Sequence, residues 1–547
     1  MANLILGPAL RYVDETDATV WVETDAPCVV DVLGHQSRTF TVSGHHFALV
    51  HVAGLEPGTS TEYGVALDGE PCWPEPGSAF PPSIIRTPED HREAKIVFGS
   101  CRVAAPHEPP YTLSKDDDDR GREVDALYAL ALRMRDQPPE EWPHLLLMLG
   151  DQVYADEVSP RTLEFIRARR DTSRPPGEDV ADFEEYAQLY LESWREPVMR
   201  WLMSTVATAM IFDDHDLVDD WNISESWIAD MRELEWWDER LIGAFMSYWC
   251  YQHIGNLPPD ELHTDEMWDL VCGCEDGAEH LRPFALRADR ETEGTRWSYC
   301  RDYGDVRVMV IDSRAGRVLK DGRRAMVDDD EWAWMCEQLV GGSEHLLIAT
   351  SLPLLLAPGV HHFEAWNEAV CDGAWGPAGS WLGEKIRRGL DLEHWAAFGE
   401  SFERMTTRIR EVAAGEHGPA PASIIVLSGD VHHAYLAEVA FPREAGVQSA
   451  VYQATCSPVR NPLDDKEKRV VKFGGSRTAH AIGRLMARSA GVEDPDLRWR
   501  FVKRPWFDNQ VATLELRDRN ALLRIERTVP DEWEHPKLHG CLERHLT

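Results

Sequence analysis

The sequence predicts an α/β protein with a small all-β domain at its N-terminus. From Tyr12 to Thr87, short alternating or β-branched runs are separated by turn residues, which is typical of antiparallel strands. After Lys95, continuous apolar runs take their place, and each is long enough for a strand of a sheet that is covered on both faces. Helix-like insertions between these runs complete the α/β pattern.

Length and composition are those of an ordinary globular protein. The chain has 547 residues, of which 43% are hydrophobic and 28% charged, so we expect about two to four domains with a sizeable core. Lys and Arg total 56 against 95 Asp and Glu, which gives a net charge of −39. Because this charge repels polyanions, we expect no bulk nucleic-acid binding and no membrane partner.

The N-terminus and the cysteines bear on the cellular compartment. Leu4-Ile5-Leu6 stops at Gly7-Pro8, without the basic leader or the long apolar core of an export signal. The eleven cysteines are scattered, unlike the dense and even spacing of a secreted disulfide framework. We therefore expect a cytoplasmic protein, and the sequence leaves its oligomeric state open.

Four runs predict the strands of an N-terminal β-sandwich, which we place at residues 1–88: 19–24, 29–33, 47–52 and 63–67. The stretch Gly54-Leu55-Glu56-Pro57-Gly58-Thr59, followed by Tyr63, resembles the last hairpin of a fibronectin type III domain. Pro-rich residues 71–82 and then 87–90 predict a linker to the next domain.

The second domain, residues 95–530, has polar clusters directly after five of its apolar runs. These clusters are 100–102 after 96–98, 151–154 after 145–149, 213–216 after 210–212, 312–314 after 308–311, and 428–433 after 424–427. An α/β sheet builds its site at the carboxyl ends of such strands. We therefore expect the five clusters to lie close together.

Three further segments can be assigned. Apolar residues recur at three- and four-residue spacing from Phe183 to Trp194, which predicts a helix whose aromatic residues face the core. Residues 511–516 and 521–525 flank a turn and predict a hairpin. We expect residues 531–547 to form a C-terminal tail.

The residue types in the polar clusters suit two adjacent cations, which require a bridging carboxylate and separate ligands for each ion. Asp151, at a strand end after Gly150, is the natural bridge. Tyr154 could bind the same ion as a phenolate if that ion is strongly Lewis-acidic, such as ferric iron. Cys101 offers a thiolate and His432 an imidazole.

Hard oxygen ligands for a second ion come from Asp214 and Asp430, and they suit calcium, magnesium or manganese. Each predicted ligand alone also has a structural interpretation, as a buried cysteine, a turn aspartate, a core tyrosine or a packed histidine. Their shared position after buried strands favours metal binding.

In their order along the chain, these motifs resemble the alkaline phosphatase D (PhoD-like) family of metallophosphoesterases. The motifs are Ser100-Cys101, Gly150-Asp151-x-x-Tyr154, Asp213-Asp214-His215-Asp216 and Ser428-Gly429-Asp430-Val431-His432. The resemblance covers about residues 95–530, and the preceding β-domain is similar to the small N-terminal domain of such proteins. It implies a four-layer α/β/β/α sandwich with two mixed sheets between helices.

The resemblance also implies a ligand set and two catalytic residues. Fe³⁺ would be held by Cys101, Asp151, Tyr154 and His432. Asp151 would bridge to a second ion, Ca²⁺ with Mg²⁺, Mn²⁺ or Zn²⁺ as alternatives, whose site Asp214 and Asp430 complete. His215 would protonate the leaving group, and Asp216 would orient His215.

Two arginines are candidates for binding the substrate phosphate, because the guanidinium fork matches two phosphate oxygens. Arg102 follows Cys101, and Arg314 follows a strand in Asp312-Ser313-Arg314. A structural salt bridge is an equally good interpretation of each arginine.

We therefore expect a binuclear phosphoesterase that hydrolyses small-molecule phosphodiesters or phosphomonoesters by attack of a metal-bound hydroxide. One alternative is a monoesterase similar to purple acid phosphatases, although Cys101 argues against it. The other is a noncatalytic protein that keeps the fold as a binding scaffold. The sequence has neither a Gly-x-x-x-x-Gly-Lys-Ser/Thr loop nor a Gly-x-Ser-x-Gly elbow, so nucleotide-loop and serine-hydrolase chemistry are not expected.

Overall fold

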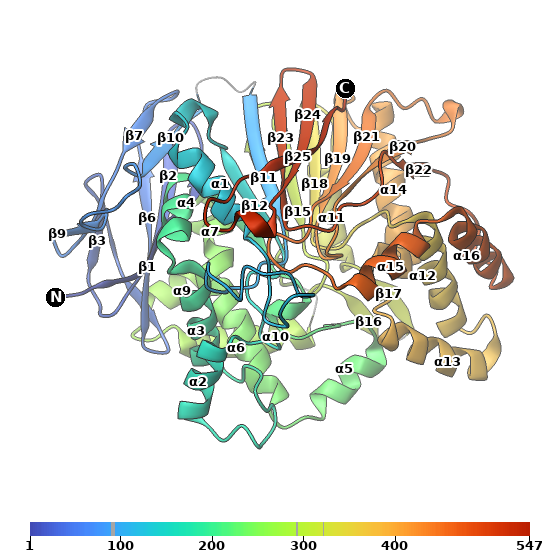
Figure 1. Ribbon diagram of the computed structural model, residues 1–547, viewed down its shortest axis with the longest axis horizontal. Helices are drawn as coiled ribbons and strands as arrows, with labels where there is room; N and C mark the ends of the chain where they lie inside the picture. Colours follow the sequence, from blue (N-terminus) through green and yellow to red (C-terminus); the bar gives the residue numbers. More distant parts are fainter. Residues whose placement is uncertain (89–92, 292–293, 321) are drawn as a thin grey trace.

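A computed structural model describes residues 1–88, 93–291, 294–320 and 322–547. Its N-terminal part, blue in Figure 1, is a β-sandwich of two four-stranded sheets. One sheet has the order β1 (Leu4–Val13), β2 (Asp17–Thr24), β6 (His45–Ala53) and β5 (Phe40–Val42); the other has β4 (His35–Arg38), β3 (Val29–Val32), β8 (Val65–Leu67) and β9 (Glu70–Trp73). Alternate apolar residues of both sheets share one core, as expected for strands with a buried face.

The Pro-rich segment after the sandwich is partly regular. Its first residues belong to β9, and it leads into β10 (Ile84–Arg86), which pairs antiparallel with β7 (Ser60–Glu62). Of the stretch 87–90 that was predicted as linker, residues 89 and 90 lie outside the described residues.

The second part of the chain contains a six-stranded mixed sheet. Its order is β13 (Ala207–Ile211), β12 (Leu145–Leu149), β11 (Glu93–Gly99), β23 (Gln510–Arg517), β24 (Asn520–Arg527) and β25 (His539–His545). The three β11–β13 strands are parallel, and β23 and β24 form the predicted hairpin. Residues 531–547, expected as a tail, include β25, which pairs antiparallel with β24 at the sheet edge.

A seven-stranded sheet faces the first. Its order is β14 (Tyr299–Tyr303), β15 (Val306–Ile311), β18 (His345–Thr350), β19 (Ser423–Ser428), β21 (Ala450–Thr455), β20 (Tyr435–Ala440) and β22 (Arg498–Phe501). From β15 to β21 the strands are parallel. All five apolar runs predicted as strands thus coincide with β11, β12, β13, β15 and β19, the third run extending one residue past β13.

The two sheets pack face to face between helices, which confirms the predicted four-layer architecture. In β15, Val308 and Val310 join the core between the sheets, whereas Met309 and Ile311 pack with helices α11 (Asp329–Gln338) and α14 (Gly399–Ala414). On the other side, α1 (Ala126–Arg135) contacts β23, and α4 (Pro197–Thr205) contacts β13.

The remaining large helices lie at the ends of the sheets. The predicted helix 183–194 is α3 (Phe183–Trp194), which packs with α2 (Pro160–Arg169) and α6 (Trp237–Ser247) at the lower left of Figure 1. Beyond the second sheet lie α12 (Pro358–Cys371), α13 (Gly376–Gly389) and α16 (Arg477–Ser489). Within the described ranges, no helix has the length and apolarity needed to cross a membrane.

Candidate metal centre

The loops after β11, β12, β13 and β19 meet where the two sheets come together. The backbone N–H of Cys101 donates to the carbonyl of Gly150 at 3.2 Å, which joins the loops after β11 and β12. The N–H of Asp430, after β19 in the other sheet, donates to Ser100 Oγ at 2.9 Å. The sequence clusters are therefore brought together by parallel strands that end at one edge.

Two glycines allow this close approach. A Cβ atom on Gly150, whose φ is +103°, would lie 2.5 Å from the Cβ of Asp213, and one on Gly429 would lie 2.2 Å from Ser100 Oγ. Because real Cβ contacts are longer than this, any side chain at either position would push two strand ends apart.

Four of the predicted ligands have left-handed backbone conformations. The φ angles of Cys101, Asp151, Asp430 and His432 are 58°, 51°, 65° and 49°. Such values are uncommon for residues other than glycine, cost free energy, and cluster at functional sites. The strain is consistent with side chains that the surrounding fold holds in imposed directions.

One donor group combines Cys101, Asp151 and His432, which offer ligand atoms within 4.8 Å of one another. Tyr154 lies beside it: its hydroxyl donates to Asp151 Oδ2 at 3.4 Å and accepts from Asn461 Nδ2 at 3.2 Å. Burial lowers the pKa of His432 to about 3, so its ring is neutral and has a lone pair to offer. Thiolate, imidazole and phenolate together suit a transition metal.

A second donor group combines Asp151, Asp213 and Asp214, again with oxygen atoms within 4.8 Å of one another. Asp151 thus belongs to both groups, as a bridging carboxylate must. The sequence analysis did not assign Asp213 as a ligand, although its place beside Asp214 was a signal for it.

The carboxylates of the second group fit bound cations. Three buried carboxylate oxygens have no hydrogen-bond partner among the described residues: Oδ1 of Asp151, Oδ2 of Asp213 and Oδ1 of Asp214. Burial raises the pKa of Asp151 and Asp213 well above the usual range and that of Asp214 to about 7. Buried oxygens without a hydrogen-bond partner are costly, and a bound cation would satisfy them.

Arg314 neutralises this cluster and is not free to bind a substrate. Its guanidinium is fully buried; Nε pairs with Asp213, Nη1 pairs with Glu393, and Nη2 lies 3.2 Å from Asp214 Oδ1. Nη2 also lies 3.5 Å from Asp430 Oδ1. With carboxylates on every side, Arg314 has the structural role that the sequence left open, and the substrate-binding expectation is corrected.

Arg102 is also committed to protein partners. Its Nε donates to Asp125 Oδ2 at 2.8 Å, and Nη1 donates to the Ser193 carbonyl at 3.0 Å. The side chain is 4% exposed. These contacts fasten the loop after β11 to α1 and α3. The expectation that Arg102 also binds the substrate phosphate stays a prediction.

His215 faces a carboxylate that the sequence analysis missed. Its Nδ1 lies 2.9 Å from Asp156 Oδ1, and Asp156 also accepts the N–H of Asp219 at 2.7 Å. Burial disfavours the charged ring, but Asp214 and Asp156 raise the pKa of His215 well above its usual value. Asp156 follows Asp151 by five residues, which was its only signal in the sequence.

Asp216 has a different role from the predicted one. Its carboxylate accepts the backbone N–H groups of Asp213, Asp151 and Val153 at 2.9, 3.1 and 3.3 Å. It therefore ties the loop after β12 to the loop after β13 and does not orient His215. The expectation for Asp216 is corrected because its side chain is consumed by the backbone of its own turn and the neighbouring loop.

A second carboxylate–histidine pair, also missed, lies on the opposite flank. His394 Nδ1 is 2.8 Å from Glu364 Oε1, and its Nε2 is 3.2 Å from Asp430 Oδ2. Burial opposes the charge of Asp430, but His394 and Arg314 hold the pKa of this carboxyl below its usual range. Neither His394 nor Glu364 follows a predicted strand, so the sequence gave no reason to place them here.

Comparisons with known proteins agree with this architecture. Residues 127–268 match the family model of PhoD-like phosphatases, and residues 1–85 match that of a domain of unknown function, DUF7800. The first range includes Asp151, Tyr154, Asp214 and His215, whereas Cys101, Asp430 and His432 lie outside it. No curated protein matches the chain.

Among solved structures, one described as the structure of PhoD aligns with 99% of this chain and 92% of its own, with a TM-score of 0.60 and 12% identity. At this identity the likeness shows a shared fold. A maltogenic amylase from S. marinus aligns with 95% of this chain and 76% of its own at 9% identity, but its TM-score of 0.17 carries no structural argument. The resemblance seen in the motifs is thus confirmed: the chain contains a PhoD-like phosphatase domain, at residues 127–268, within the fold of PhoD.

Proposed function

We propose that this protein is a phosphoesterase that hydrolyses small-molecule phosphodiesters or phosphomonoesters at a centre for two cations. The observation that carries the proposal is the membership of Asp151 in both donor groups, because one carboxylate can then hold two ions close together. The PhoD-like phosphatase match over residues 127–268 supports the reaction class.

The donor chemistry suggests which ions belong where. Cys101, Tyr154 and His432 favour Fe³⁺, since thiolate and phenolate both donate charge to it. The carboxylates of Asp214 and Asp430 favour Ca²⁺, with Mg²⁺, Mn²⁺ or Zn²⁺ as alternatives. Cations bound there would lower the pKa of a nucleophilic water and neutralise charge that develops on the phosphoryl group.

The chain itself supplies a proton. With Nδ1 held by Asp156, the ring of His215 can donate from Nε2 to the departing oxygen. Both side chains are partly buried, with 23% of His215 and 12% of Asp156 exposed, so the carboxylate can orient the ring while solvent still reaches it. No covalent enzyme intermediate is expected, because water is the nucleophile in this scheme.

The proposal is tested by elemental analysis of the purified protein together with a screen of phosphate monoesters and diesters. The variant Asp151→Asn should lose bound metal and turnover together, because the amide no longer balances two cations. Asp116→Asn, a change in an exposed loop outside the centre, is the matched control. Iron bound by Tyr154 and Cys101 should also give the protein a visible absorption band.

Two outcomes would contradict the proposal. Wild-type protein with full metal content and no hydrolysis of any ester would favour the noncatalytic scaffold. Asp151→Asn protein that kept both metals and near-normal turnover would show that Asp151 is not the bridge.

A further inference from the structure

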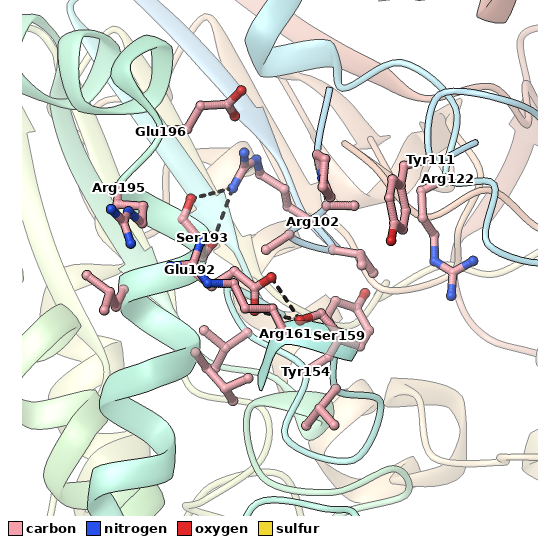
Figure 2. A pocket seen from close by; sticks show the side chains of 18 of the residues that line it. Arg102, Tyr111, Arg122, Tyr154, Ser159, Arg161, Glu192, Ser193, Arg195 and Glu196 are labelled. Atoms are coloured by element: carbon pink, nitrogen blue, oxygen red, sulfur yellow. Dashed lines mark hydrogen bonds between the residues drawn. The ribbon is translucent and has the colours of Figure 1, made fainter. Parts of the chain in front are cut away.

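A cavity of about 1000 Å³ is lined by Tyr154, one of the predicted metal ligands, together with Arg102, Arg161 and Arg195. Figure 2 shows these side chains. The cavity wall combines the loop after β11, the loop after β12, the end of α3 and the starts of α2 and α4. The N-terminal domain completes the wall with Leu4, Ile5 and Glu75. The cavity thus lies at a junction of domains, which is a common location for ligand sites.

Tyr154 connects this cavity to the proposed chemistry. Its side chain lines the cavity, and its hydroxyl is 3.4 Å from Asp151 Oδ2. The same ring packs on His215, with 4.8 Å between ring centroids. Tyr154 is therefore the lining residue past which an ester bound at the metal centre would have to extend to reach the cavity.

The cavity is unusually rich in arginine for a chain with a net charge of −39. Its lining has six arginines, Arg102, Arg120, Arg122, Arg161, Arg195 and Arg200, against five acidic residues, Glu75, Asp119, Glu157, Glu192 and Glu196. Glu157 pairs with Arg122, Glu75 pairs with Arg200, and Glu192 accepts the Ser159 hydroxyl at 2.8 Å. The carboxylates are therefore largely engaged already.

Two of the arginines differ from the others. Arg161, in the first turn of α2, and Arg195, directly after α3, are exposed. In the part of the chain that the structure describes, neither has a hydrogen-bond or ion-pair partner. Each of the other four arginines pairs with a carboxylate: Arg102 with Asp125, Arg120 with Asp118, Arg122 with Glu157, and Arg200 with Glu75. Arg161 and Arg195 therefore line the cavity with guanidinium groups that are free to bind a ligand.

The size of the cavity indicates more than a phosphate group. A volume of about 1000 Å³ is at the upper end of ordinary ligand sites, so a phosphomonoester of a small alcohol would leave most of it empty. Apolar residues, among them Val103, Val158, Leu189 and Leu191, also line it. The occupant should therefore have both an apolar body and an anionic group.

We propose that the cavity binds the part of the ester beyond the scissile phosphate, and that Arg161 and Arg195 recognise a further phosphate on it. The substrate is then a small diester with at least one additional phosphate. This inference rests on the proposed phosphoesterase function and adds the substrate class to it. Guanidinium groups suit the role because they bind phosphate through paired N–H donors.

The test compares three substrates that share one scissile bond: the dinucleotide thymidylyl-thymidine, and the same molecule with a phosphate at its 5′ end or at its 3′ end. Cleavage of the internal diester is followed by product analysis. We expect kcat/KM for one phosphorylated form to exceed that for the plain dinucleotide by roughly tenfold, as two charge-assisted contacts from exposed arginines would allow.

In the double variant Arg161→Gln/Arg195→Gln this preference should fall to about one, since charge-assisted contacts to the extra phosphate are lost. Arg167→Gln is the matched control, because Arg167 is on the same helix but pairs with Glu178 outside the cavity. It should keep the preference. A wild-type enzyme without any preference, or a double variant that retains it, would overturn the inference.

Calorimetric binding of inorganic pyrophosphate separates this inference from the proposed function. We expect the double variant to bind pyrophosphate roughly tenfold more weakly than wild type and than Arg167→Gln. If none of the dinucleotides is cleaved, the proposed hydrolysis of diesters is wrong. The pyrophosphate comparison still shows whether Arg161 and Arg195 bind phosphate in the cavity. Equal affinity in all three proteins would then refute the role of Arg161 and Arg195.

Discussion

At the scale of single residues, the position of His215 depends on a contact outside its own motif. It lies in the short 3₁₀ turn η2 (Asp214–Asp216), where neighbouring side chains point in different directions. Asp214 faces the donor groups, His215 turns to Asp156, and Asp216 turns to backbone N–H groups. Three adjacent residues can therefore have three separate roles.

His215→Ala should reduce activity in a way that depends on the leaving group. A proton donor matters when the departing oxygen is a poor leaving group and little when it is a stable phenolate. We expect kcat to fall by about two to four orders of magnitude on an alkyl ester and much less on a nitrophenyl ester. Metal content should stay near wild type. Equal losses on both esters together with depleted metal would make His215 a ligand or a packing residue instead.

Asp156→Asn should lower kcat by about tenfold to a hundredfold, because outer partners of functional histidines typically contribute that much. The carboxylate of Asp156 helps to raise the pKa of His215. Without this carboxylate the pKa of His215 should fall, so the ring loses its proton at lower pH. The alkaline limb of the pH–rate profile should therefore shift to lower pH. In a His215→Ala background the change should have little further effect. Additive losses would show that Asp156 acts independently of His215.

Sequence reasoning predicted the types of side chain at the centre better than their contacts. Cys101, Asp151 and His432 could be predicted to lie close together because each follows an apolar run that had to be a strand, and strand ends gather at one edge. Asp156 and His394 were missed because contacts made by loop residues depend on turn geometry that has no periodic signature. Whether a buried arginine such as Arg314 meets carboxylates or substrate is equally invisible until the strands are placed.

At the scale of elements, the continuous apolar runs were reliable because strands buried on both faces leave no polar positions. The residues just past them decide how closely the strands approach. The loop after β12 reaches β13 because Gly150 has no side chain to meet Asp213. The loop that carries Asp151 is thus positioned by the glycine before it.

Gly150→Ala should destabilise the fold and loosen the metal centre. The added Cβ would lie 2.5 Å from that of Asp213, in addition to the cost of a φ of +103°. Gly177→Ala is the matched control, since Gly177 has a φ of +76° and nothing within 4 Å of its added Cβ. We expect a loss of about 1 kcal/mol for the control and about 2–4 kcal/mol for Gly150→Ala. Thermal unfolding measures the stability of the two variants, and elemental analysis measures their metal content. Equal losses of stability in the two variants would mean that backbone strain alone matters.

At the scale of the whole molecule, the N-terminal β-sandwich is fastened to the second domain by buried polar contacts. The Tyr63 hydroxyl donates to the Ser204 carbonyl at 2.6 Å, and Trp21 Nε1 donates to the Cys250 carbonyl at 2.9 Å. Such contacts lose their partners if the domains separate, and unmet buried groups are costly. The sandwich is therefore expected to unfold together with the catalytic region, as one cooperative unit.

Arg11 provides the strongest of these contacts and the sharpest test of this coupling. It is fully buried, and its guanidinium donates to the carbonyls of Thr208, Tyr251 and Gln252 at 2.9, 2.7 and 2.7 Å. Arg11→Leu should lower the free energy of unfolding by about 3–5 kcal/mol, because three carbonyls lose a charged donor and stay buried.

Arg38→Leu is the control, because Arg38 is an exposed arginine of the same domain, and its loss should stay within about 0.5 kcal/mol. In calorimetry both proteins should unfold in a single transition, at a clearly lower temperature for Arg11→Leu. Two separate transitions in wild type would show that the domains unfold independently. A melting temperature unchanged by Arg11→Leu would show that the buried guanidinium does not couple them, whatever its hydrogen bonds.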